Sequence, residues 1–175
     1  MPSGKTHDAI TLLLAIPVGA ATFVATDDLR LASLVTAGFI FGGLMFGPDL
    51  DTVSTQYSRW KIFRFLWIPY RTFFRHRSRW SHGLVFGTFL RVVYFMGAAT
   101  LVAFLAVYAY SSYQGGSLPG LWDYPPVWGR LRQYADSIFG SYGLIGVFIG
   151  LWTGAASHTF TDLAGTYIKT GRARV

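Results

Sequence analysis

The residues best suited to chemistry in this chain are its four histidines and some of its aspartates. Asp49 and Asp51 follow Gly-Pro with a single residue between them, so both carboxylates could face one cation or bridge two. His76 and His82 could present two imidazoles around a turn. Simpler interpretations remain open, because the aspartates could cap a helix or pair with nearby arginines, and each histidine could be hydrogen-bonded at the surface.

His158 and Asp162 form a third pair with an informative spacing. Residues four apart share one face of a helix, so this imidazole and this carboxylate could bind the same ion. Ionisable groups on an apolar helix are costly and usually functional. Nitrogen and oxygen ligands without thiolates predict one or two divalent ions, with zinc, manganese or iron favoured over magnesium. Two ions about 3.5–4 Å apart are a common arrangement for phosphoester cleavage.

The composition indicates that these residues lie in a membrane protein. Hydrophobic residues make up 52% of the 175 residues and charged residues only 13%, against about 25% charged in a typical soluble domain. The mean hydropathy of +0.38 agrees. Cysteine is absent, which excludes disulfides, thiolate metal sites and cysteine nucleophiles.

The predicted fold is an all-α integral membrane protein with about four transmembrane helices, in a single domain covering residues 1–175. A helix needs about 17–25 residues to cross the hydrocarbon layer. Glycines three or four apart in the second and fourth apolar stretches allow close backbone approach, so we expect those two helices to form a tight interior pair. The predicted helices cover approximately residues 9–25, 31–48, 83–110 and 142–163.

The basic residues predict that both termini are cytoplasmic, because Lys and Arg are retained on that side of a membrane. The 49–82 connection carries seven of them and the C-terminal tail three, whereas the 26–30 and 111–140 connections carry three together. Four crossings then place the chemically capable residues at one membrane face, near the ends of all four helices. These residues are His7, Asp8, Asp49, Asp51, His76, His82, His158 and Asp162.

Residues 60–75 predict an interfacial segment within the long cytoplasmic connection. Aromatic and basic residues alternate there, and the run is too short and too charged to span a bilayer. We expect its aromatic side chains to enter the lipid and its arginines to reach anionic headgroups, either as a simple anchor or as a platform for lipid substrates. The expected partners are the bilayer, anionic lipid headgroups, and a membrane protein or a second copy of the chain. A nucleic-acid partner is not expected, because the basic run adjoins apolar spans.

Four motifs together resemble a known group of membrane proteins. They are Ser3-Gly-Lys-Thr-His-Asp8, Gly42-Gly-Leu-Met-Phe-Gly-Pro-Asp-Leu-Asp51, His76-Arg-x3-Ser-His82 and His158-x3-Asp162. This set is similar to small cyanobacterial-type membrane proteins described as metal-binding, which are related to the YdjM-like group of membrane-bound metal-dependent hydrolases. The resemblance implies a cyanobacterial source, and hence a plasma or thylakoid membrane. It also implies a ligand set of His7, Asp49, Asp51, His76, His82, His158 and Asp162.

Two functions fit these observations. The first is a metal-dependent hydrolase that cleaves a phosphoester or lipid-like substrate at the cytoplasmic membrane face. In that enzyme Arg77 would bind phosphate oxygens and His7 or Asp8 would act as a base. The second is a non-enzymatic metal-binding membrane protein or an accessory subunit of a larger membrane complex.

Overall fold

The computed structural model describes residues 3–73, 83, 86–115 and 124–171, and this part of the chain is helical without a β-strand. Its long elements are α1 (Gly4–Thr26), α2 (Leu29–Met45), α6 (Phe86–Tyr113), α7 (Tyr124–Phe139) and α8 (Gly143–Thr170). Short helical segments between α2 and α6 are η1 (Pro48–Asp51), α3 (Thr55–Arg59), η2 (Lys61–Trp67) and α4 (Ile68–Phe73). The prediction of an all-helical protein is confirmed for the described residues.

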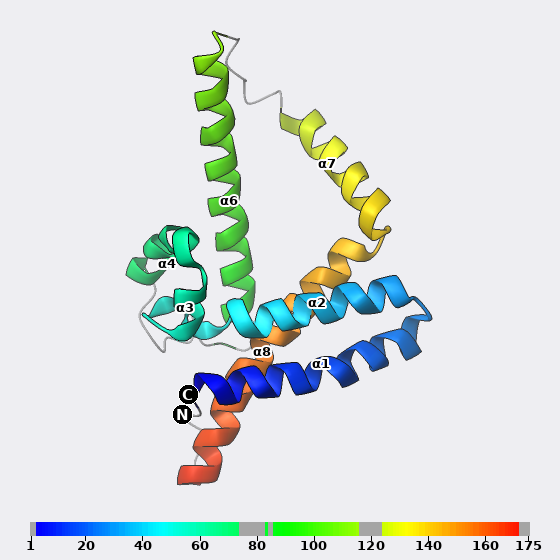
Figure 1. The fold of residues 1–175 in the computed structure, drawn as a ribbon, viewed down its shortest axis with the longest axis vertical. Helices are drawn as coiled ribbons and strands as arrows, with labels where there is room; N and C mark the ends of the chain where they lie inside the picture. The colour runs from blue at the N-terminus through cyan, green and yellow to red at the C-terminus, as the bar shows by residue number, and fades with distance from the viewer. Residues whose placement is uncertain (1–2, 74–82, 84–85, 116–123, 172–175) are drawn as a thin grey trace.

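Helices α1 and α2 form an antiparallel hairpin, and α8 packs against α2 along much of its length (Figure 1). The turn of the hairpin is short because Asp27 ends α1 in the left-handed region, at φ 51°. Asp28 then caps α2 by accepting a hydrogen bond from the backbone nitrogen of Leu31 at 3.0 Å. Helix α6 runs across the direction of this hairpin, while α7 contacts α8 and α2 (Figure 1).

Several helix boundaries differ from the predicted ones, and the differences position the site. Helix α1 begins at Gly4 rather than near residue 9, because Ser3 caps it and accepts a hydrogen bond from the backbone nitrogen of Thr6. His7 therefore lies within α1 instead of before it. Helix α2 ends at Met45, since Pro48 disfavours helical geometry in the residue before it. The segment 111–140, expected to be a connection throughout, contains α7.

Glycines bring α2 and α8 into close contact, as predicted. A Cβ atom added at Gly38 would lie 2.6 Å from the carbonyl oxygen of Val147. A Cβ added at Gly154 would lie 2.8 Å from the carbonyl carbon of Phe39 and 2.9 Å from the nitrogen of Gly43. All three distances are shorter than ordinary contacts, so only glycine permits this separation of the two helices. The tight interior pair of helices is confirmed.

An aromatic cluster joins the short helices to α6, and it corrects one part of the interfacial prediction. Trp60, Trp67 and Tyr70 are buried, and the partly buried Phe95 of α6 packs against them. These aromatic side chains therefore belong to the protein core and do not enter lipid. The exposed apolar residues of the segment are others, among them Ile62, Phe63, Phe65 and Ile68.

Three helices are long and apolar enough to cross a membrane: Gly4–Thr26, Phe86–Tyr113 and Gly143–Ile168. Helix α2 is apolar but has 17 residues, a length of about 26 Å at 1.5 Å per residue. The hydrocarbon core of a bilayer is about 30 Å thick. The described residues therefore contain three candidate spans, and a fourth crossing by α2 stays a prediction.

Candidate metal centre

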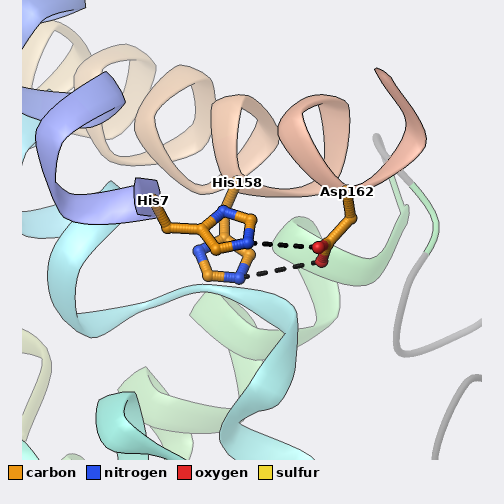
Figure 2. Close-up of side chains that lie close together, drawn as sticks. All are labelled: His7, His158 and Asp162. Carbon is orange, nitrogen blue, oxygen red and sulfur yellow. Dashed lines mark ion pairs between the residues drawn. The ribbon is translucent and has the colours of Figure 1, made fainter. Parts of the chain in front are cut away.

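Three buried side chains converge where the start of α1 meets the second half of α8 (Figure 2). They are His7, His158 and Asp162, with 5%, 4% and 6% of their surfaces exposed. One potential ligand atom from each lies within 4.8 Å of the others. His158 and Asp162 share a helix face because they are four residues apart on α8, and the α1–α8 contact brings His7 to them.

The polar atoms of this cluster are close together yet poorly satisfied. His7 Nε2 lies 3.1 Å from Asp162 Oδ1, and His158 Nε2 lies 3.8 Å from Asp162 Oδ2. Neither carboxylate oxygen of Asp162 makes a hydrogen bond with a described residue. His158 Nε2 is also buried without one. Unpaired buried polar atoms are costly, and a cation among them would remove that cost. The donor set therefore fits a metal ion.

The two imidazoles lie face to face. Their ring centroids are 3.8 Å apart and their planes differ by 12°. Both Nε2 atoms are on the side of the stack that faces Asp162 (Figure 2). The two nitrogens therefore point in similar directions from parallel rings.

Asp49 approaches the same cluster from the turn that follows α2. Its Oδ2 lies 3.6 Å from Nε2 of His158. The backbone of this turn is held in place because the carbonyl oxygen of Asp49 accepts hydrogen bonds from Ser54 Oγ at 2.7 Å and from the nitrogen of Thr52 at 3.2 Å. Asp49 is thus a fourth residue within reach of the cluster.

Gln56 contacts the other nitrogen of His158 and had no signal in the sequence. Its Nε2 donates to the carbonyl oxygen of Gly43 at 2.9 Å and lies 3.1 Å from Nδ1 of His158. This orientation matches the tautomer with the ring proton on Nε2. Binding of a cation by Nε2 requires the ring proton on Nδ1 instead. The Oε1 of Gln56 is buried and has no hydrogen-bond partner among the described residues. After rotation of the amide, this oxygen could accept a hydrogen bond from Nδ1.

A second buried polar group lies behind the Pro48–Asp51 turn. Arg91 of α6 is completely buried and donates a hydrogen bond to Thr88 Oγ1 at 2.9 Å. It also interacts electrostatically with Tyr70, Asp51 and Asp49. Burial raises the pKa of the Tyr70 hydroxyl, an effect that Arg91 opposes and Asp51 supports. Arg91 was missed from the sequence, although a charged residue within an apolar span is a recognisable signal.

The cluster opens into a polar cavity of about 290 Å³. Asp8 and Arg59 line it as an ion pair, and Arg59 also donates to the carbonyl oxygen of Leu44 at 2.8 Å. The charge of Asp8 is therefore already compensated, so its predicted role as a base would require this pair to open. His76, Arg77 and His82, which were also predicted to take part, lie outside the described residues.

Comparison with known proteins supports a metal site. An uncharacterized protein of Aquifex aeolicus (strain VF5) is 38% identical over 58 residues, which is 33% of this chain and 40% of that protein. No solved structure matches the chain. A family described as "Uncharacterized metal-binding protein (DUF2227)" matches residues 2–172. The match covers almost the whole chain, and the protein therefore belongs to this family of metal-binding proteins.

Proposed function

We propose that this protein is a membrane-embedded, metal-dependent hydrolase that acts on a phosphoester or lipid-like substrate at the cytoplasmic membrane face. One observation carries the proposal. The unsatisfied nitrogen and oxygen atoms of His158 and Asp162 are buried beside His7, and the cluster opens into a cavity. A closed structural site would not need that access.

The residues of the site have separate roles in this proposal. His7, His158 and Asp162 hold the metal, with Asp49 completing the set. A bound divalent ion lowers the pKa of its water to about 7 and offsets charge on phosphoryl oxygens. The pair of Asp8 and Arg59 lines the cavity, where the guanidinium could orient a phosphate group once its own partner moves.

Membrane embedding is supported by the outward faces of the helices. Leu13, Ile16 and Val24 of α1 are largely exposed, as are Met96 and other apolar residues of α6. Exposure of such apolar surfaces to water is unfavourable, whereas the hydrocarbon of a bilayer accommodates them. In the proposed topology four helices cross a plasma or thylakoid membrane, both termini are cytoplasmic, and zinc, manganese or iron is the metal.

The segment η2–α4 supports contact with lipid headgroups. Ile62, Phe63 and Phe65 are exposed next to the exposed basic residues Lys61 and Arg64. Apolar side chains beside basic ones are typical of surfaces that insert into an anionic leaflet. A lipid-like substrate would be abundant at such a surface.

The experiment is hydrolysis of a broad panel of phosphodiesters and phospholipids by the detergent-purified protein, with Zn²⁺ or Mn²⁺ supplied. We expect metal-dependent turnover that Asp162→Asn abolishes. Asp136→Asn is the matched control, because Asp136 lies on α7, where it forms an ion pair with Arg132 at 3.9 Å, and it is not a member of the metal cluster. A protein that binds metal but turns over nothing in the panel would contradict catalysis.

A second candidate, an accessory subunit of a larger complex, is supported by α6. None of the apolar window of this candidate span is buried within the chain, so a partner membrane protein could cover it. A stoichiometric partner that copurifies with the metal-loaded but inactive protein would favour this function over hydrolysis.

A further inference from the structure

The stacked histidines restrict how many ions the site can hold. Two imidazoles bound to one ion, each about 2.0–2.1 Å from it, must diverge from that shared point. Their planes then cannot lie face to face. His7 and His158 are instead stacked, with centroids 3.8 Å apart and an angle of only 12° between the planes. In this arrangement each Nε2 points to a position of its own.

The carboxylate of Asp162 matches this pair of positions. Its Oδ1 lies 3.1 Å from the Nε2 of His7, and its Oδ2 lies 3.8 Å from the Nε2 of His158. Each oxygen therefore faces a different imidazole (Figure 2). A carboxylate with one oxygen toward each of two neighbouring positions is well placed to bridge two cations.

Asp49 makes the two positions unequal. Its Oδ2 is 3.6 Å from the Nε2 of His158, so the position beside His158 has a second carboxylate within reach. Among the described residues, the position beside His7 has Asp162 as its acidic neighbour in the metal cluster. The position beside His158 should therefore bind a cation more tightly.

We propose that the centre holds two divalent ions bridged by Asp162, one bound by His7 and the other by His158 with Asp49. This inference rests on the proposed metal binding and specifies its form. The 3.8 Å separation of the rings agrees with the spacing of about 3.5–4 Å in two-metal sites, which bind the attacking and leaving oxygens of a phosphoryl group. The substrate class favoured by this geometry is a phosphate ester.

The test is titration of the metal-depleted, full-length protein in detergent with Mn²⁺. Elemental analysis gives the number of bound ions, and electron paramagnetic resonance detects magnetic coupling between ions a few ångströms apart. We expect two Mn²⁺ per chain, a coupled spectrum at full occupancy and two unequal affinities. One ion per chain, or two ions without coupling, would overturn the two-ion centre. One ion would leave the proposed metal binding intact, whereas no bound ion would refute that function itself.

Variants assign the two positions. His7→Ala should retain one ion and lose the coupling, while Asp162→Asn should lose the coupling and weaken both ions at least about tenfold. Asp136→Asn should behave as the unaltered protein. If His7→Ala does not fold, His7→Gln keeps a side chain of similar length and should also remove the coupling. A His7→Gln protein that kept two coupled ions would rule out His7 as a ligand.

Discussion

The substitution Gly154→Ala tests whether the close packing of α2 and α8 builds the metal centre. The new Cβ would lie 2.8 Å from the carbonyl carbon of Phe39, and closer still to its oxygen. Carbon atoms in favourable contact are about 3.5 Å apart, so the helices must separate by at least about 0.7 Å. Overpacking of this kind costs about 1–3 kcal/mol, which corresponds to a Tm lower by about 2–12 °C for a chain of this size.

The same substitution should also weaken metal binding. His158 is one turn further along α8, and Gln56 connects it to the backbone of Gly43 on α2. Separation of the helices would pull these groups apart. Thermal unfolding in detergent followed by tryptophan fluorescence, together with Mn²⁺ titration, measures both effects.

Gly97→Ala is the matched control for this prediction. Gly97 lies on α6, and a Cβ added there would meet nothing within 4 Å. Alanine favours a helix over glycine by about 1 kcal/mol, so the control should unfold at the same temperature or higher. If Gly154→Ala and Gly97→Ala had equal Tm values, the argument from backbone contact would be wrong.

Three further predictions concern the surroundings of the site. Gln56→Leu should weaken metal binding about 10–100-fold in a titration, because partners of a ligating histidine have effects of this size; the exposed Gln114→Leu should not. Arg91→Met and Asp51→Asn should each destabilise the fold by about 3–5 kcal/mol, since each removes one charge of a buried interacting pair. In chemical denaturation, the double variant should lose less free energy of unfolding than the two single variants lose together. Strict additivity of the two losses would show that the two charges are not coupled. The raised pKa of Tyr70 contributes stability at every pH below the ordinary tyrosine pKa of about 10. This stability is lost as the pH rises further, because Tyr70 ionises at a lower pH in the unfolded chain than in the folded one. Tyr70→Phe should therefore show a smaller loss of Tm between pH 9 and pH 11, and an equal loss would contradict this cause.

Some features were predictable because they depend on neighbours in the sequence. The helical class follows from long apolar stretches, and the pairing of α2 with α8 follows from glycines three or four residues apart. The spacing of His158 and Asp162 was sufficient to place them on one helix face. The exact ends of the helices were less predictable, because the Ser3 cap and the effect of Pro48 compete with hydropathy at those positions.

Other features depended on contacts between distant residues. Gln56 and Arg91 could not be assigned partners from the sequence, because the groups that they contact lie far along the chain. The prediction that Trp60 and Trp67 enter lipid was wrong for the same reason, since α6 packs against them and they are buried. Basic and aromatic residues in alternation do not reveal which side chains face the protein.

The sequence by itself therefore determined a helical, lipid-compatible chain with histidines and aspartates in metal-ligand spacings. Tertiary structure decided that His7 stacks on His158 and that the two oxygens of Asp162 face different imidazoles. The physical reason is that ring orientation depends on the packing of α1 against α8, which residue spacing along one helix does not encode. That orientation changes the expectation of one or two ions into the proposal of two.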